Sequence, residues 1–433
     1  MVMQSAFMVA APVDPDCEAD LRTLLATMNR LPGFADPDNE LVPFGRFETL
    51  HFARFVILRD TTLGDLAAYG SSFPDAPVWL VLLGECDGPA PAMLVALAER
   101  AGAGLRRIFA FCRGFDEGAD LLAWLRTREV QPAAFYVNWR GRSVRRIREE
   151  ASLHRALRAW LDENGAALAN AAPTQVRDRL IAYVAAEQRA GRLALTPEPA
   201  PDATARLREL LTLIGVPLLL LALAPALIVL APLFLWILRR HETRDPVIAP
   251  RPAAAHLAEL TRREDHDVSN QFSAFGCVKP GLFRLGTLRA LLWLLDWSMR
   301  AIYVRGRLAR VPTIHFARWA FLDGQRRLLF ASSYDGSLDS YMDDFINKVA
   351  WGLNLVFSNG IGYPATRFLI GGGAKDELAF KAYIRRHELP TEVWYKAYPG
   401  LGTVDLACNT RLREGLERAA MDADAARHWL ALI

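Results

Sequence analysis

The sequence predicts an α+β protein made of two similar repeats, joined by a membrane-inserted helical segment and an amphipathic helix at the membrane interface. Three observations lead to this fold class. The pentapeptide HFARF at 51–55 returns as HFARW at 315–319. Apolar, strand-like runs alternate with helical patterns around both copies. Between the copies, residues 210–238 carry no charged side chain.

The similarity between the two copies extends beyond the pentapeptide. In each copy a second apolar run is followed by Asp-Gly, at 87–88 and at 335–336. Further identities keep the same order along the chain, at offsets of 260 and then 259 residues. Collinear matches of this kind indicate an internal duplication. The matched residues are Arg107, Asp116, Glu117, Tyr136, Gly141, Leu153 and Leu157 with Arg367, Asp376, Glu377, Tyr395, Gly400, Leu412 and Leu416.

The first repeat is expected to alternate strands and helices, with its first helix capped near Asp14. Apolar runs bounded by turn residues predict the strands, and longer runs predict the helices. Their order fits a split βαβ, or ferredoxin-like, unit. The strands are predicted at 7–13, 49–58, 78–84, 106–112 and 133–139, and the helices at 15–29, 90–102 and 117–127.

The second repeat has a comparable pattern, and Gly371, Gly372 and Gly373 within it predict a tight turn, because they lack the spacing of a phosphate-binding loop. Its strands are predicted at 313–322, 326–333, 366–370 and 392–398, and its helices at 337–356, 375–387 and 404–420. The domain organisation follows from these elements. It comprises a first repeat at 1–160, a helical linker at 161–209, the membrane segment at 210–240, a polar loop with the amphipathic helix at 241–311, and a second repeat at 312–433.

The uncharged segment is longer than the roughly 20 apolar residues that cross a bilayer. The segment ends in aromatic and basic residues that are typical of a membrane boundary, Trp236, Arg239 and Arg240. Three prolines interrupt the segment, which leaves two topologies open: a single crossing, or a re-entrant hairpin. Two repeats that pack together must lie on one side of the membrane, which favours the hairpin. The expected location is the cell membrane, with the soluble parts on the cytoplasmic face.

The segment 281–304 carries four charged side chains, too many for a comfortable bilayer crossing. It predicts a basic amphipathic helix in the interface, with Trp293 and Trp297 at the depth of the lipid headgroups. Its arginines point to anionic lipid as a partner. The alternative is an ordinary helix that packs on the domain.

Composition excludes several functional classes. The net charge of +3 comes from 51 basic and 48 acidic residues, a balance that argues against a dedicated nucleic-acid-binding protein. The five cysteines are odd in number, and none stands at metal-ligand spacing from another cysteine or a histidine. The sequence therefore predicts no metal site and no disulfide framework, and it leaves the oligomeric state open.

Two repeats of this kind can pack sheet against sheet and enclose a cavity. In this respect the sequence resembles the dimeric α/β-barrel superfamily, which includes the dye-decolourising peroxidases. GECDG at 84–88 matches the GxxDG pattern of these peroxidases. The resemblance implies a catalytic role for Asp87 in peroxide cleavage, with haem as the cofactor. The second copy, SSYDG at 332–336, keeps only Asp-Gly, as a turn after a strand would.

A second resemblance rests on the C-terminal half of the chain. KPG at 279–281, IHFARW at 314–319 and VWYKAYPG at 393–400 are its most distinctive blocks. With them, the sequence is similar to a family of bacterial membrane-associated proteins to which no activity is attached. This resemblance implies a membrane location and names no reaction.

His315 and Arg318 are the catalytic candidates of the second copy. In a regular strand their side chains point to opposite faces, so only one of them lines a cavity between the sheets. The structural alternative is that the histidine caps the strand edge and the arginine pairs with a helix carboxylate such as Asp339 or Asp343. No HExxH, GxSxG or P-loop motif is present to support a hydrolase or a nucleotide-binding protein.

Polar and aromatic residues of the C-terminal half are expected to line a pocket between the repeats. These residues are Asn270, Lys279, Asn359, Tyr363, Arg367 and Tyr395. The resulting hypothesis is a membrane-anchored protein, in one form an oxidoreductase, that holds an apolar or lipid-like ligand. The alternatives are a non-catalytic membrane-associated scaffold that binds a partner protein, and a haem-dependent peroxidase-like enzyme.

Overall fold

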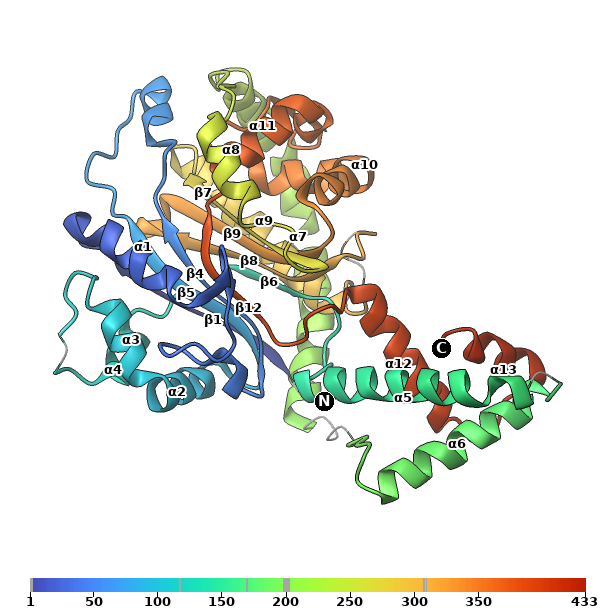
Figure 1. Cartoon of the computed structure of the whole chain (residues 1–433). Helices are drawn as coiled ribbons and strands as arrows, with labels where there is room; N and C mark the ends of the chain where they lie inside the picture. Colours follow the sequence, from blue (N-terminus) through green and yellow to red (C-terminus); the bar gives the residue numbers. More distant parts are fainter. Residues whose placement is uncertain (1–2, 117, 169, 198–202, 307, 309) are drawn as a thin grey trace.

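The computed structural model describes residues 3–116, 118–168, 170–197, 203–306, 308 and 310–433. These residues form a mixed α+β fold whose centre is a pair of sheets. Helices cover the outer faces of both sheets, and a group of further helices projects to one side (Figure 1).

The first sheet has six strands in the order β1-β5-β4-β12-β3-β2. The three long strands β1, β5 and β4 are antiparallel, and each is nine residues long. The strands are β1 (Gln4–Pro12), β2 (Asn29–Leu31), β3 (Phe34–Ala35), β4 (Leu50–Leu58), β5 (Trp79–Asp87) and β12 (Thr391–Lys396).

The second sheet has four strands in the order β6-β8-β9-β7, all antiparallel to their neighbours. Its strands are β6 (Ala134–Val137), β7 (Ser269–Cys277), β8 (Ile314–Leu322) and β9 (Arg327–Asp335). A separate two-stranded hairpin joins β10 (Thr366–Arg367) to β11 (Gly371–Gly372).

The two sheets have matching strand orders and exchange one strand. In each sheet a strand of the HFAR pentapeptide, β4 or β8, has a long neighbour on one side and a shorter neighbour on the other. The short neighbour of β4 is β12, from the C-terminal part of the chain, and the short neighbour of β8 is β6, from the N-terminal part. Strand 133–139 was expected to extend the first sheet; its core, β6, completes the second sheet instead.

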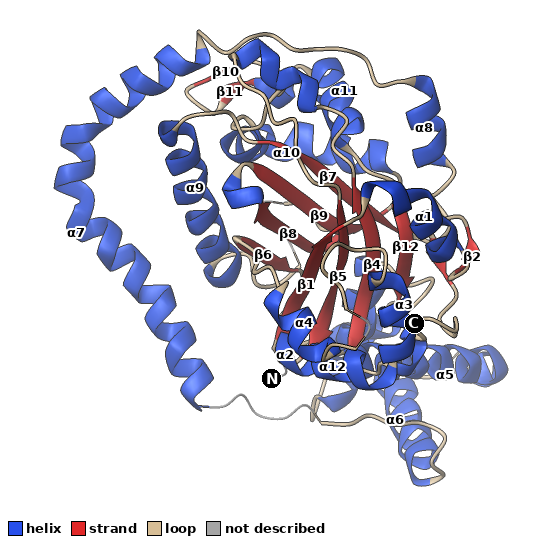
Figure 2. Ribbon diagram, turned by 90° about the vertical axis from the view of Figure 1, so that its left-hand side faces the viewer, coloured by secondary structure: helices blue, strands red, loops and turns tan. Residues whose placement is uncertain are grey.

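Apolar side chains join the sheets to helices on both outer faces. Helices α1 to α4 pack on the first sheet, and α9, α10 and α11 pack on the second (Figures 1 and 2). The helices are α1 (Glu18–Ala26), α2 (Ala90–Arg100), α3 (Gly102–Phe109), α4 (Leu121–Thr127), α8 (Ala254–Thr261), α9 (Leu282–Ala301), α10 (Leu338–Phe357) and α11 (Glu377–His387).

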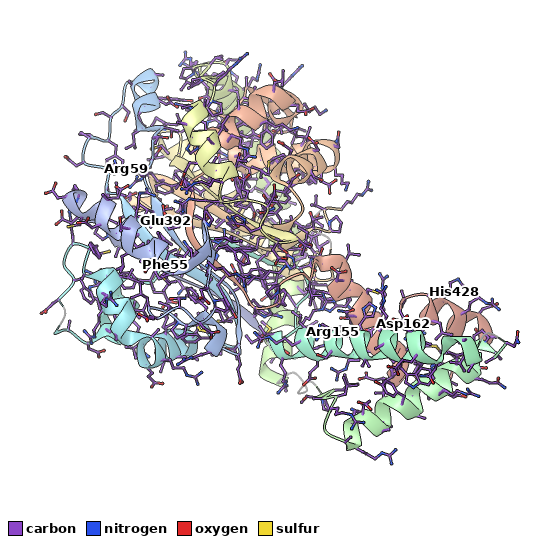
Figure 3. All side chains as sticks on the ribbon, viewed as in Figure 1. Phe55, Arg59, Arg155, Asp162, Glu392 and His428 are labelled. Atoms are coloured by element: carbon purple, nitrogen blue, oxygen red, sulfur yellow. The ribbon has the colours of Figure 1, made fainter. Side chains whose placement is uncertain are left out.

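Four helices form a lateral extension with an apolar core of its own (Figure 1). Polar side chains such as Arg155, Asp162 and His428 cover it and point into solvent (Figure 3). The helices are α5 (Val144–Leu168), α6 (Pro173–Arg189), α12 (Thr403–Glu417) and α13 (Ala423–Leu430). Because α5 runs from 144 to 168, it crosses the boundary expected at residue 160.

Helix α7 (Ala203–Glu242) is continuous through all three of its prolines. The predicted re-entrant hairpin at 210–240 is therefore wrong for this structure: the segment does not turn back. Among the described residues, only the stretch Leu210–Glu242 is long and apolar enough to cross a membrane, with a mean hydropathy of 2.8, and none of its most apolar part is buried. Figure 2 shows α7 bowed along the side of the domain that carries α9.

Two further predictions differ from the structure. Residues 106–112 were expected to form a strand, but 102–109 form helix α3, whose apolar face packs into the core and whose Gly104 lies directly on the backbone of Leu41. The polar loop expected before the amphipathic helix contains β7, the edge strand of the second sheet, so this sheet begins before residue 312.

Candidate functional site

The space between the two sheets is filled by apolar side chains and two buried arginines. Arg54 donates to the carbonyl oxygens of Phe272 and Ser332 in the second sheet, at 2.9 Å each. Arg318 donates to the carbonyl oxygens of Phe7 and Gly84 in the first sheet, at 2.7 Å each. Each arginine therefore joins the two neighbouring strands of the opposite sheet. The predicted pocket between the repeats is wrong, because this volume is a packed core.

The two arginines differ in their side-chain partners, and Arg54 also donates to the hydroxyl of Ser273 at 3.2 Å. Arg318 also pairs with the carboxylate of Glu85, which is buried with it. At the matching place Arg54 meets the hydroxyl of Ser333 at 2.7 Å. Burial lowers the pKa of Arg54 to about 10, and the nearby Arg318 acts in the same direction while Glu85 opposes it. The expected partner of Arg318 was a helix carboxylate, Asp339 or Asp343; the actual one lies on a strand of the other sheet.

The two histidines of the pentapeptides bind the two aspartates of the Asp-Gly turns. His315 Nε2 lies 2.6 Å from Asp335, and His51 Nε2 lies 3.0 Å from Asp87. The other oxygen of each aspartate accepts the first amide of a helix in the lateral extension, Thr403 N at 2.6 Å or Val144 N at 2.8 Å. Both His-Asp pairs thus connect a strand to a helix N-terminus.

The direction of His315 differs from the expectation. A shift of register between Ile314 and Phe316 marks a β-bulge, and β4 has the same irregularity between Leu50 and Phe52. Because a bulge adds one residue to the strand, the alternation of faces fails there. The ring of His315 lies 5.3 Å from that of Phe52, so it faces the first sheet, as Arg318 does.

Burial alone would raise the pKa of the Asp335 carboxyl. The charge of His315 and hydrogen bonds from His315, Ser269 and Thr403 outweigh burial and hold the pKa well below its usual range. The carboxylate is therefore a structural anion. Asp87 has the same two kinds of partner, which explains the Asp-Gly turn without peroxide chemistry.

Haem does not fit these residues. The space that His51 and His315 line together is about 20 Å³, close to the size of one water molecule. Each histidine already uses its Nε2 on a carboxylate. Among the described residues, no group of three or more His, Cys, Asp and Glu side chains could hold a metal ion.

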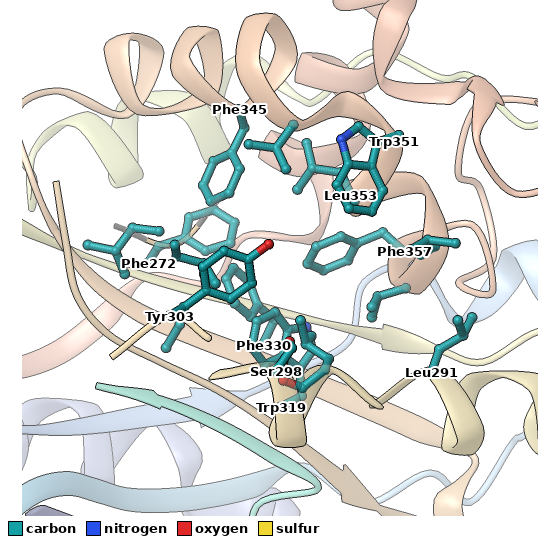
Figure 4. A pocket seen from close by; sticks show the side chains of 18 of the residues that line it. Phe272, Leu291, Ser298, Tyr303, Trp319, Phe330, Phe345, Trp351, Leu353 and Phe357 are labelled. Atoms are coloured by element: carbon teal, nitrogen blue, oxygen red, sulfur yellow. Dashed lines mark hydrogen bonds between the residues drawn. The ribbon is translucent and has the colours of Figure 1, made fainter. Parts of the chain in front are cut away.

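A large apolar cavity lies on the outer face of the second sheet, beneath α9, α10 and α11 (Figure 4). Its volume is about 330 Å³, within the range of roughly 300–1,000 Å³ typical of small-molecule sites. No histidine, cysteine or charged side chain is among the described residues that line it. Side chains of the sheet form its floor, and side chains of α9 and α10 form its walls. They include Phe272, Trp319, Phe330, Leu291, Leu294, Trp297, Met342, Phe345, Trp351, Leu353 and Phe357.

Two polar groups stand out in this apolar lining. Trp319 is 5% exposed, and its indole N–H has no hydrogen-bond partner among the described residues. Tyr303 projects between the floor and the roof of the cavity in Figure 4. The cavity reaches the surface at Trp351, which is half exposed although it lines the site.

A second, polar cavity of about 210 Å³ lies at the C-terminal end of α7. Lys279 and Tyr363 line it together with Asp245. Lys279 and Arg284 both pair with Asp245, at 2.7 and 2.5 Å, so this partly buried carboxylate binds two cations. Burial lowers the pKa of the Lys279 ammonium, while Asp245 acts to raise it.

The six residues expected to line one pocket are dispersed. Lys279 and Tyr363 share the polar cavity. Asn270 of β7 donates to Asp265 and to the Gly336 carbonyl, both in loops at the end of the second sheet, and Asn359 caps the end of α10. Tyr395 stacks on Phe44 in the core of the first sheet. Arg367 is exposed in the hairpin of β10 and β11.

The predicted interfacial residues lie on α7 and α9. Trp236 is 59% exposed, and the guanidinium of Arg240 lies 5.5 Å from its ring centre. Arg239 pairs with Glu242 at 3.0 Å. Trp293 is 45% exposed, whereas Trp297 donates to the carbonyl of Thr212 in α7 at 3.1 Å.

No protein-family model, no curated protein and no solved structure matches this chain.

The cavity on the outer face could not be placed from the pentapeptides or the Asp-Gly turns. The signal that points to it is the run of large apolar residues in 345–357, which exceeds what one face of a covering helix needs. Helix α10 is broken at Val349, above the cavity, where φ is −144° and ψ is 23°.

Proposed function

We propose that the protein is attached to a membrane through α7 and holds an apolar, lipid-derived ligand in the cavity on the outer face of the second sheet. The observation that carries this proposal is the cavity: about 330 Å³, lined almost wholly by apolar side chains, and open at its edge. An apolar cavity of this size excludes charged metabolites and favours a hydrocarbon chain or ring.

Among the described residues of the cavity floor, Trp319 has a buried indole N–H without a hydrogen-bond partner, and this donor supports a more specific ligand. A buried N–H without a partner costs about 1–3 kcal/mol, which an acceptor on the ligand would recover. Trp319 therefore favours a mostly apolar molecule with one oxygen acceptor over a plain hydrocarbon.

The position of α9 between the cavity and α7 supports delivery from a membrane. Trp297 lines the cavity and donates to α7, and Phe283 at the other end of α9 contacts Phe234 and His241 of α7. Through α9, one domain therefore contacts α7 near both ends of its apolar stretch. This favours α7 lying in the membrane plane over a perpendicular crossing, since a crossing would draw the charged domain into the bilayer.

The same contacts favour a domain on one membrane face, and we propose the cytoplasmic face, where its five cysteines stay reduced. We also infer that the two sheets descend from duplicated ferredoxin-like units. Matching strand orders and the reciprocal contacts of Arg54 and Arg318 support this origin.

Native mass spectrometry of the full chain, purified in detergent, tests the ligand proposal. Leu294→Trp and Ser298→Trp place an indole in the cavity, and Val404→Trp introduces the same side chain on α12 at a residue that is 70% exposed. The wild type and Val404→Trp are expected to carry a bound lipid-like molecule. The two filled variants should retain roughly tenfold less, since about 1.4 kcal/mol of lost affinity gives that factor. Equal retention in all four proteins would remove the cavity as the binding site.

A further inference from the structure

The hairpin between β10 and β11 contains an unusual turn. Phe368 and Leu369 have φ values of +52° and +60°, and Ile370 N donates to the carbonyl of Arg367 at 3.3 Å. Positive φ at both central positions is a type I′ arrangement, which Asn-Gly adopts easily and bulky residues resist. Two consecutive large apolar residues in this conformation mark a strained segment, and such strain persists where the surroundings impose it.

The end of α7 imposes this conformation. Glu242 is 7% exposed, and its carboxylate accepts the amides of Phe368 and Leu369, both at 2.9 Å. It also accepts the hydroxyl of Thr366 at 3.0 Å, and Arg239 donates to the Thr366 carbonyl at 3.2 Å. The turn is therefore fixed to the C-terminal end of the apolar helix.

The clamped turn presents apolar side chains to the outside. Phe368 is 38% exposed and Ile370 is 53% exposed, while Leu369 is buried beneath them. A turn that needed only to close a hairpin would favour small or polar residues at these positions. The exposed tip, formed by Phe368 and Ile370, adjoins the exposed Trp236 end of α7 through the Glu242 clamp.

Basic side chains surround the exposed tip. Arg239 and Arg367 each lie 6.0 Å from the ring centre of Phe368. Arg240 is exposed on the last turn of α7, and Arg244 is exposed just after the helix ends. The carboxylates of this stretch are engaged, Glu242 by the turn and Asp245 by Lys279 and Arg284. Apolar tips within a basic ring are the pattern of a surface that enters an anionic bilayer.

We infer that the tip of the β10–β11 hairpin is a second membrane contact, which inserts at the depth of the headgroups of an anionic bilayer beside the basic end of α7. The inference rests on the membrane attachment proposed above and adds its orientation. Helix α7 supplies the apolar depth, and the hairpin sets which side of the domain faces the bilayer beside the C-terminal end of α7.

Site-specific fluorescence on the full chain in vesicles tests this inference. Cys17 and Cys408 are changed to serine, because the other three cysteines are buried. A nitrobenzoxadiazole probe is then attached to Ile370→Cys, to Val229→Cys on α7, or to Val404→Cys on α12. The vesicles are phosphatidylcholine with phosphatidylglycerol, and spin-labelled lipids quench the probe by depth.

The probe at 370 is expected to be blue-shifted and quenched most by a lipid labelled near its headgroup. The probe at 229 should be quenched most by a lipid labelled deep in its chain, and the probe at 404 should stay in water. A probe at 370 that behaves like the one at 404, while 229 is in lipid, overturns the hairpin contact and leaves the attachment intact. A probe at 229 in water overturns the membrane attachment itself, and the hairpin contact with it.

Two variants distinguish a membrane contact of the hairpin tip from a contribution of these residues to the stability of the fold. Phe368→Asn suits the positive φ and is expected to raise the midpoint of thermal unfolding while it removes the inserted ring. Arg240→Gln with Arg367→Gln removes two cations of the ring. Both changes should reduce quenching of the 370 probe by headgroup-labelled lipid, and the arginine pair should do so only when phosphatidylglycerol is present. Unchanged quenching in a folded Phe368→Asn protein contradicts the inference.

Discussion

The two faces of the second sheet differ in polarity and in packing, although neighbouring residues of strand β8 contribute to both. On the inner face of β8, Arg318 and Ala320 pack against the first sheet, and the two terminal nitrogens of the buried arginine donate to two backbone carbonyls and to the carboxylate of Glu85. On the outer face, Ala317 and Trp319 line a cavity to which none of the described residues contributes a charged side chain. The inner face is closed and polar at its centre, whereas the outer face is open and apolar.

The residues of the inner face stabilise the fold, whereas those of the outer face line the proposed ligand site. The repeated HFAR pentapeptide belongs to the inner face, where both copies make reciprocal contacts between the sheets. The outer faces differ in what covers them: helices α1 to α4 pack on the first sheet, and α9, α10 and α11 enclose the large apolar cavity over the second. A function that rests on the cavity therefore lies where the two halves of the molecule differ.

The largest expected loss of stability comes from a substitution on the inner face of the second sheet. Arg318→Met leaves the buried carboxylate of Glu85 without its cation, and loss of one partner from a buried pair costs about 3–5 kcal/mol. Adding Glu85→Met should recover most of this loss, because replacing both partners removes the unpaired charge. Lys381→Met on α11 breaks two half-exposed ion pairs on the outer side and should cost no more than about 1 kcal/mol.

Urea unfolding in detergent, followed by tryptophan fluorescence, measures these differences. An Arg318→Met protein as stable as Lys381→Met would show that the charges between the sheets do not hold them together. Failure of the double variant to recover would point instead to the lost contacts with the backbone carbonyls of Phe7 and Gly84.

The alternation of residues along β8 could be predicted from the sequence from Phe316 onwards, and the structure confirms it for Ala317, Arg318 and Trp319. The direction of His315 could not, because the bulge before Phe316 depends on how β8 pairs with β9. Strand β7 was missed for a related reason. Its polar residues, such as Asn270, are satisfied by partners that the fold brings from elsewhere, so no apolar alternation marks the strand.

Neither the cavity nor the exchange of β6 and β12 between the sheets could be predicted from the sequence. Strands were expected at both places, but nothing in a strand of four or six residues indicates which sheet it joins. A cavity is a volume that side chains fail to fill, and this depends on the relative placement of α9, α10 and the sheet. Local patterns predict elements, and they do not predict the gaps between them.

An intermediate effect is expected from the carboxylate at the end of β9. The pKa of Asp335 is depressed in the folded protein, so its contribution to stability is complete above the unfolded value of about 3.9 and is lost as the pH falls below it. Asp335→Asn should cost roughly 2–3 kcal/mol at neutral pH, and the cost should shrink in acid. Asp339→Asn, at an exposed residue of α10, is the matched control and should show neither effect.

Unfolding free energies from neutral pH to pH 3 test this expectation. A cost that stays constant across the range would mean that the amide removes packing rather than an ion pair with His315. That outcome would also weaken the view that the inner face is held by charge.

The smallest change in stability is expected on the outer face, where it most directly tests the difference between the two faces. Trp319→Phe removes the indole N–H that has no partner, and keeps an aromatic ring on the cavity floor. In protein stripped of lipid, the loss of an unsatisfied donor should offset the lost ring contacts, leaving stability within about 1 kcal/mol of the wild type. In protein that keeps its ligand, the same change should lower retention of a ligand with an oxygen acceptor by roughly tenfold, since a lost hydrogen bond is worth about 1–1.5 kcal/mol. Native mass spectrometry and unfolding of the same preparations measure both quantities. Stability that falls sharply while retention is unchanged would mean that the outer face is packed like the inner one, and the contrast between the two faces would fail.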